Sequence, residues 1–165
     1  MPEKKYILDE ATTERKLRRM AYEIFENNIE EHELILAGID DNGVVIAKEI
    51  KKMLADISDT KTEMISISLD KRFPKEIKLS RQTNFNDKVI IIIDDVANSG
   101  KTLLYALKPF LEFHPKKIQI LVLVERTHKA FSIKPDYVGL SLSTTFKEHI
   151  FVEVSNDRVT GAWME

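Results

Sequence analysis

The sequence of 165 residues contains no cysteine, so disulfide bonds and metal sites built on thiolates are excluded. It also lacks any apolar run that approaches the roughly 20 residues of a membrane-spanning helix. The start of the chain, MPEKKYILDE, has no apolar stretch of the kind that a signal peptide carries. We therefore expect a soluble, cytoplasmic protein with no membrane partner.

An excess of charge of either sign is absent as well. Lys and Arg number 25 and Asp and Glu number 27, so the net charge is −2. No field of the whole protein drives binding to nucleic acid or to an anionic membrane, and a basic patch would have to be local. A chain of this length fits one domain, so residues 1–165 are expected to fold as a single unit.

Two glycine-based nucleotide motifs are also missing. The segment SGKT (99–102) matches the end of a nucleotide P-loop, but the motif G-x-x-x-x-G-K-[ST] needs a glycine at the position that Asp95 holds. A carboxylate there disfavours the phosphate cradle of a kinase or an ATPase. The dinucleotide fingerprint G-x-G-x-x-G occurs nowhere in the chain.

What is present is an alternation of strand-like and helix-like segments. A first helix is expected after a cap at Asp9 or Thr12, and a second begins near Gly43 after the apolar run 33–39. Further strands are expected at 63–69, 89–93, 117–125, 136–142, 148–154 and 158–164, a third helix from about Lys101 to Phe113, and a long loop at 70–87. This order predicts an α/β fold, a parallel twisted sheet flanked by helices, with ligands at the carboxyl ends of the strands. The strand-rich last third predicts a small subdomain over the sheet edge.

The stretch VIIIIDDVANSGKTLL (89–104) places two adjacent acids between a branched apolar strand and a turn of small residues. The turn, residues 97–102, offers backbone amides, hydroxyls and a helix N-terminus to an anion. An anion pressed against Asp94 and Asp95 would be repelled, so the ligand must hold its charge apart from them. A sugar phosphate meets this condition, because its phosphate enters the turn while its hydroxyls donate charge-assisted hydrogen bonds to the carboxylates.

At these residues the sequence resembles the type I phosphoribosyltransferases, whose signature is an apolar strand, two acids and a small-residue loop ending in [TS]-G-[KR]-T. The resemblance implies that Asp94 and Asp95 bind the ribose hydroxyls of phosphoribosyl pyrophosphate and are the catalytic residues. It assigns the 5′-phosphate to Ala97, Asn98, Ser99, Gly100, Lys101 and Thr102.

The resemblance covers most of the chain. It is closest to the bacterial pyrimidine-operon attenuator/uracil phosphoribosyltransferases, which share the ILDE segment (7–10). It implies the type I phosphoribosyltransferase fold, with a small hood formed mainly from the C-terminal strands, and a homodimer.

A second segment, ERTHKAFSIKPDYVGLSLST (125–144), follows the family pattern of Arg and His after a strand and then a D-Y-x-G turn. In the family this region closes on the base, so the resemblance assigns the base side to Arg126, His128, Tyr137 and Val138. His128 is equally well explained as a solvated or capping residue. Asn98 stands where purine-salvage enzymes place an aspartate, and an amide cannot act as a general base, which disfavours a purine.

The pyrophosphate side departs from the family. Asp40-Asp41-Asn42-Gly43 stands where relatives carry a basic or hydroxyl residue before the glycine. Two carboxylates are poor direct ligands for pyrophosphate; they could bind Mg²⁺, the loop could use its backbone amides alone, or Asp41 or Asn42 could cap the helix near Gly43. The pyrophosphate side is assigned to Asp41, Asn42, Gly43, Lys71 and Arg72, the last two being alternatively a solvated pair at a strand end.

The implied activity is Mg²⁺-dependent transfer of a phosphoribosyl group to a nitrogenous base, preferably a pyrimidine and first of all uracil, with release of pyrophosphate. Asp94 and Asp95 are the expected metal ligands, directly or through water. The alternative is a regulator of pyrimidine genes that senses phosphoribosyl pyrophosphate or a nucleotide and binds RNA with little turnover. RNA is not favoured, because the basic residues of the first helix, Arg15, Lys16, Arg18 and Arg19, are typical of a solvated face.

A phosphoacceptor receiver domain also carries paired acids at a strand end. It needs them on an early strand, with a phosphorylated aspartate on a later one. Residues 89–95 form about the third strand and precede an anion-binding turn, so this class is disfavoured.

Replacing Asp95 with asparagine (Asp95→Asn) is expected to weaken the binding of phosphoribosyl pyrophosphate by roughly tenfold or more, since a hydrogen bond to a charged group is worth about 1.5–3 kcal/mol. The fold should be retained. Titration calorimetry measures the affinity and circular dichroism checks the fold. An unchanged affinity would remove the ribose assignment from Asp95.

Overall fold

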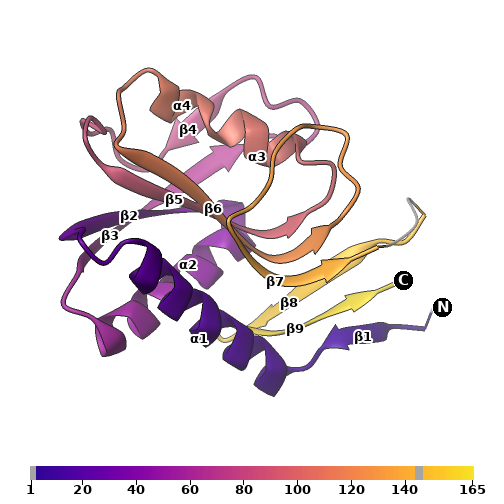
Figure 1. Ribbon diagram of the computed structural model, residues 1–165. Coiled ribbons are helices and arrows are strands. Elements are labelled where there is room, and N and C mark those ends of the chain that lie inside the picture. Colours follow the sequence, from indigo (N-terminus) through magenta and orange to yellow (C-terminus); the bar gives the residue numbers. More distant parts are fainter. Residues whose placement is uncertain (1–2, 144–146) are drawn as a thin grey trace.

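The computed structural model describes residues 3–143 and 147–165 (Figure 1). Its strands are β1 (Lys5–Leu8), β2 (Glu33–Ile39), β3 (Lys61–Leu69), β4 (Ile77–Leu79), β5 (Val89–Ala97), β6 (Lys117–Arg126), β7 (Tyr137–Leu142), β8 (Ile150–Ser155) and β9 (Arg158–Met164). Its helices are α1 (Glu10–Asn27), α2 (Asp40–Ile57), α3 (Lys101–Ala106) and α4 (Lys108–Leu111). Within the described ranges, no helix combines the length and the apolar character needed to cross a membrane.

The larger sheet has six strands in the order β4-β3-β2-β5-β6-β7. Its neighbours pair in parallel, except that β4 runs antiparallel to β3. Helices α1 and α2 lie on one side of this sheet and α3 and α4 on the other (Figure 1). The predicted parallel sheet flanked by helices is therefore confirmed.

The central strand β5 is buried on both faces, as its branched residues predict. Ile91 and Ile93 belong to the apolar core that includes α1 and α2, whereas Ile90 and Ile92 belong to the core that includes α3 and α4. Successive residues of a strand point to opposite faces, so one strand serves both cores. Because β5 lies between β2 and β6, its last residues are held in the middle of the sheet's carboxyl edge.

The passage from β2 into α2 is unusually tight. A Cβ at Gly38 would lie 2.7 Å from Val44 Cα, and a Cβ at Gly43 would lie 2.5 Å from the carbonyl oxygen of Ile93. Glycine at both positions lets the first turn of α2 rest directly on β5. The predicted helix start near Gly43, capped by Asp41 or Asn42, is wrong, since α2 begins at Asp40 and has no side-chain cap.

The hood is the smaller sheet, in the order β1-β9-β8. Its two C-terminal strands were expected, but β1 was not, because four residues are too few for alternation to be visible. Pairing of β1 with β9 brings the two ends of the chain together. On this sheet Phe151 stacks on Trp163, with ring centroids 4.4 Å apart, and Lys4 Nζ lies 4.6 Å from the Trp163 ring centroid.

Two further segments differ from the sequence prediction. The long loop 70–87 contains β4, and its end is anchored by Phe85, whose ring centroid lies 4.9 Å from that of Phe110. The single helix expected from Lys101 to Phe113 is divided at Leu107 into α3 and α4. Pro109 has no N–H to donate to a carbonyl one turn earlier, which explains the division.

Replacing Gly43 with alanine is expected to destabilise the fold by roughly 1–3 kcal/mol, because the new methyl group forces α2 away from the Ile93 carbonyl. Urea unfolding measures this loss. Lys52→Ala, at an exposed position of the same helix, is the control and should change stability by less than about 0.5 kcal/mol. Equal stability of Gly43→Ala and the unmodified protein would contradict the close packing described above.

Candidate active site

The two adjacent acids lie within β5, which continues to Ala97, two residues beyond them. Asp94 is 1% exposed, and its Oδ1 accepts a hydrogen bond from the Asp95 N–H at 2.9 Å. Asp95 is half-buried, and its Oδ1 accepts from the Val96 N–H at 2.8 Å. These backbone bonds orient both carboxylates at the carboxyl edge of the sheet.

Burial raises the pKa of the Asp94 carboxyl well above its ordinary value of 3.8, and the neighbouring charge of Asp95 raises it further. Lys71 opposes this shift, with its Nζ 3.9 Å from Asp94 Oδ1. Lys71 is half-exposed and comes from the loop between β3 and β4. A charged group from another segment thus partly compensates an acid that has lost its water.

The turn after β5 is narrower than predicted and spans Asn98–Gly100. Gly100 has a φ of 86°, and a Cβ there would lie 2.7 Å from the Ile133 side chain, so only glycine fits. The carbonyl of Ser99 accepts a hydrogen bond from the Phe131 N–H at 3.0 Å. The segment after β6 therefore holds the turn in place.

A cavity of ≈ 200 Å³ opens between the acids and this turn. It is lined by Lys71, Asp94, Asp95, Val96, Ala97, Asn98, Ser99, Gly100, Thr102, Leu103 and Ile150. The structure thus brings together both acids and all of the predicted phosphate-binding residues except Lys101. The Lys101 ammonium instead donates a hydrogen bond to the carbonyl oxygen of Arg72, at 3.2 Å.

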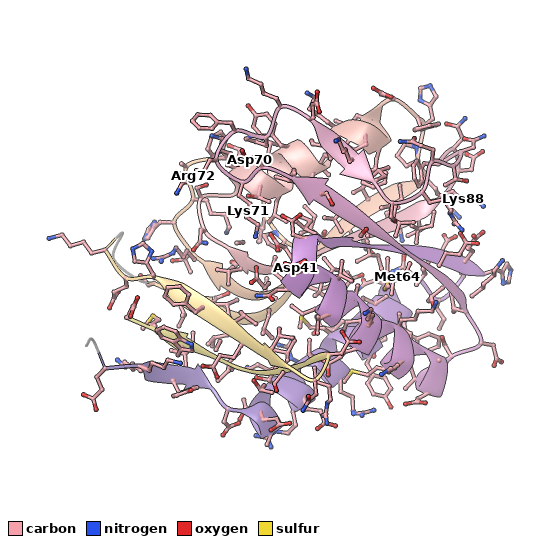
Figure 2. All side chains as sticks on the ribbon, turned by 180° about the vertical axis from the view of Figure 1, so that it is seen from behind. Asp41, Met64, Asp70, Lys71, Arg72 and Lys88 are labelled. Atoms are coloured by element: carbon pink, nitrogen blue, oxygen red, sulfur yellow. The ribbon has the colours of Figure 1, made fainter. Side chains whose placement is uncertain are left out.

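The five residues predicted for the pyrophosphate side are divided by the structure. Lys71 lines the cavity, and Asn42 donates from Nδ2 to Asp95 Oδ2 at 2.9 Å. Gly43 is buried against Ile93, while the side chains of Asp41 and Arg72 are exposed. Figure 2 shows Asp70, Lys71 and Arg72 on the same side of the molecule as Asp41 at the start of α2.

Two features of Asp40, the first residue of α2, are energetically unfavourable. Its φ of 45° is rare for a residue other than glycine, and partial burial raises the pKa of its carboxyl. The Lys71 ammonium and the Leu69 N–H oppose that shift. Lys71 therefore stands between the acids of β5 and the acid at the start of α2.

A second cavity, of ≈ 370 Å³, adjoins the first and shares Asn98, Ser99 and Ile150 with it. Its remaining lining residues are Arg126, His128, Ala130, His149 and Phe151. Arg126 is 9% exposed, and its Nε donates to Asn98 Oδ1 at 2.9 Å, while its NH2 group donates to the carbonyl of Glu148. Two of the predicted base-side residues, Arg126 and His128, thus lie in one hollow beside the phosphate turn.

The other two predicted base-side residues lie elsewhere. Tyr137 is 1% exposed and donates from its hydroxyl to Gln119 Oε1 at 2.8 Å; burial raises its pKa to about 12. The carbonyl of Val138 accepts from the Arg19 guanidinium at 3.0 Å. Both residues stand at the start of β7, whereas the cavities open beyond the ends of the strands.

Sequence reasoning missed the wall of the second cavity that β8 supplies, namely Ile150 and Phe151, with His149 just before them. An alternating strand near the end of the chain carries no local mark of a ligand site. These side chains reach the turn because β8 contacts β5 in the folded protein, although the two strands are far apart in the sequence.

Similarity to known proteins covers most of the chain. Residues 4–157 match the family model described as the phosphoribosyl transferase domain. The bifunctional protein PyrR of Streptococcus pneumoniae is 32% identical over 157 residues, which cover 92% of this chain and 90% of that protein.

Solved structures give the same fold at lower identity. A hypoxanthine-guanine phosphoribosyltransferase from Bacillus anthracis superposes with a TM-score of 0.74 and 20% identity, covering 91% of this chain and 87% of its own. The hypoxanthine phosphoribosyltransferase of Trypanosoma cruzi has a TM-score of 0.76 and 15% identity, covering 86% and 83%.

The raised pKa of Asp94 predicts a pH-dependent stability. The folded protein keeps this proton at pH values where the unfolded chain, with a carboxyl pKa near 3.8, has lost it. The stabilisation that the raised pKa of Asp94 gives to the folded protein is therefore complete below pH 3.8. It is lost as the pH rises through the native pKa. Asp94→Asn should therefore gain stability relative to the unmodified protein over the pH range that begins at 3.8 and extends upward through the native pKa.

Urea unfolding at several pH values measures this difference. Asn can still accept the Asp95 N–H, so the variant keeps the local hydrogen bond. Asp59→Asn, at an exposed position, is the matched control. A stability difference between Asp94→Asn and the unmodified protein that stays constant over this range would contradict the prediction.

Proposed function

This chain belongs to the phosphoribosyltransferase family, and we propose that it transfers the 5-phosphoribosyl group of phosphoribosyl pyrophosphate to uracil, releasing pyrophosphate. The observation that carries the proposal is the pair of adjoining cavities at the carboxyl edge of β5. One has acids and an anion-binding turn, and the other has apolar walls with a few polar groups. A sugar phosphate and a planar base fit these two environments, and the shared residues lie where they would meet.

The first cavity suits the donor. Ribose hydroxyls donate to Asp95, which has remaining lone pairs, and to Asp94, whose carboxyl group has acceptor oxygens in either protonation state. The phosphate is received by the backbone amides and hydroxyls around Ser99 and Thr102. Holding both ends of the sugar orients its anomeric carbon toward the second cavity, which supplies the rate advantage of proximity.

Mg²⁺ is the proposed cofactor. The residues of the site supply too few ligands to hold it alone, so the substrate would have to supply the others. Among residues 3–143 and 147–165 no group of three or more Asp, Glu, His or Cys side chains is arranged to hold a metal ion. Asp95 is the more accessible carboxylate, and oxygens of the donor would complete a hard-oxygen coordination shell. Bound there, Mg²⁺ supplies positive charge for the departing pyrophosphate. Lys71 adds a second positive charge at the same place.

Water exclusion is assigned to the loop between β3 and β4. Since β4 is paired with β3, the segment free to close over the cavity is residues 70–76 rather than the whole of 70–87. Lys101 already bonds to the Arg72 carbonyl in this segment. Closure would keep water from competing with the base for the anomeric carbon.

The second cavity favours an oxo-pyrimidine. Because arginine has donors and no acceptor, the side-chain atom of Asn98 that faces the Arg126 Nε must be the amide oxygen. The Asn98 NH₂ group is then left as a donor for the ligand. The carbonyl oxygens of uracil accept such bonds. The walls formed by Ile150 and Phe151 bury its faces. A carboxylate general base of the kind expected for a purine is not among the lining residues described.

The second candidate function is the RNA-binding regulator of pyrimidine genes. It is favoured by the name of the Streptococcus pneumoniae relative, which describes that protein as bifunctional. The first helix does not support it strongly, because Arg18 pairs with Glu14 at 3.7 Å and Arg19 is bonded to Glu23 and to the carbonyl of Val138. A homodimer and a cytoplasmic location are further proposals from the family resemblance.

A panel of bases, tested for pyrophosphate release with Mg²⁺ and phosphoribosyl pyrophosphate, checks the proposal. Uracil should be preferred over hypoxanthine and guanine by about 10²-fold or more in kcat/KM, because the described lining of the second cavity holds no carboxylate to act as the general base expected for a purine. Release with hypoxanthine alone would contradict the assignment of the second cavity. Salt-dependent retention of RNA in a gel shift, with little turnover of any base, would support the regulator instead.

A further inference from the structure

The Asn42 side chain touches two segments that belong to different parts of the cleft. Its Nδ2 donates to Asp95 Oδ2 at 2.9 Å and to the backbone carbonyl of Val152 at 3.4 Å. Asp95 is the accessible acid of the donor cavity. Val152 belongs to β8, next to Phe151 and two residues from Ile150, which line the base cavity. One amide group therefore connects the two cavities.

The position of Asn42 is rigidly determined. The next residue, Gly43, rests against the Ile93 carbonyl, so the first turn of α2 cannot slide along β5. Farther along α2, Lys48 Nζ lies 3.2 Å from Asp157 Oδ1, and Glu49 Oε2 accepts from the Val159 N–H at 3.3 Å. The hood hairpin is thus anchored to α2 by contacts that do not involve Asn42.

The orientation of the amide is forced as well. A carboxylate oxygen and a backbone carbonyl both accept, so Asn42 must present its NH₂ group to them. With Val96 donating to Oδ1 and Asn42 to Oδ2, both oxygens of Asp95 are engaged and its rotation is restricted. The lone pairs left over point in fixed directions, which is what a ribose hydroxyl needs.

We propose that Asn42 is a positioning residue that orients Asp95 toward the ribose and links this orientation to the base-lining strand β8. The proposal rests on the proposed function. It gives Asn42 a role different from direct contact with pyrophosphate, since its donors are already used. A change in the orientation of Asp95 when the donor binds would reach β8, a wall of the base cavity, through the Asn42 amide.

Two variants separate this role from a structural one. Asn42→Ala removes the donor, and Asn42→Asp keeps the shape but places a carboxylate against Asp95 and the Val152 carbonyl. At about pH 8, where an ordinary aspartate is ionised, the affinity for phosphoribosyl pyrophosphate with Mg²⁺ should fall roughly tenfold in Asn42→Ala and further in Asn42→Asp. A residue that only fills space would show the opposite order, because aspartate is nearly isosteric with asparagine.

Calorimetry measures these affinities without requiring turnover. Asn42→Ala combined with Asp95→Asn should bind no more weakly than Asp95→Asn alone, since Asn42 acts through Asp95. The KM for uracil should also rise in Asn42→Ala. Asn27→Ala, which removes an amide that donates to the Glu23 carbonyl on α1, is the matched control and should leave all of these values unchanged.

Two failures are distinguishable. If the unmodified protein binds the donor and Asn42→Ala binds it equally well, or if Asn42→Asp outperforms Asn42→Ala, the positioning role is overturned while the proposed function stands. If the unmodified protein neither binds the donor nor releases pyrophosphate with any base, both are overturned.

Discussion

A carboxyl group at the end of a strand buried on both faces has lost most of its water, and the surroundings of Asp94 are organised around that cost. The strand β5 lies in the middle of the sheet, and the side chain of Asp94 is buried there. The backbone of Asp95 donates to the carboxylate, and Lys71 brings a positive charge near it. A group that is expensive to bury unpaired is retained where a ligand with hydroxyl donors would complete its hydrogen bonds.

Close packing of α2 on β5 is the second constraint, and it acts on the same acids from the other side. Because Gly43 lies against the Ile93 carbonyl, α2 places Asn42 within hydrogen-bonding distance of Asp95. The hood, which is anchored to α2, lies beside the cleft. Asp40, the first residue of α2, is near the same place, because the Lys71 ammonium acts on its carboxyl as well as on that of Asp94. The cleft is therefore assembled from β5, α2, β8 and the loop after β3, each of which contributes one kind of contact.

The departures from the family pattern now have a physical context. The Asn42 amide donates to Asp95, and the oxygen of the Asn98 amide accepts from Arg126, which leaves the Asn98 NH₂ group as a donor. The acidic residues at 40 and 41 do not cap α2 through their side chains, since that helix begins at Asp40 without a side-chain cap. In the proposed function, Lys71 and a metal ion bound with the substrate would therefore supply the positive charge for pyrophosphate.

Sequence patterns anticipated most elements of the larger sheet, because apolar periodicity is a local property. The run 33–39 is β2 without a residue of error, and Asp9 caps α1 by accepting from the Thr12 N–H. The pattern was insufficient where strands are very short, as in β1 and β4, or where a single proline divides a helix, as at Pro109. In these cases the outcome depends on pairing partners or on one lost donor rather than on periodicity.

The candidate site divides in the same way. The order of residues in 94–102 by itself determined that two acids would stand just before a turn of small residues, because these residues are neighbours in the chain. Only the tertiary structure decided that Tyr137 lies in the core and that Lys101 bonds to Arg72 instead of lining the first cavity. It also decided that Ile150 and Phe151 line the second cavity. The physical reason is that the sequence gives the chemistry of each side chain directly. The partners of a side chain, in contrast, come from segments that are distant in the chain and meet only in the folded protein.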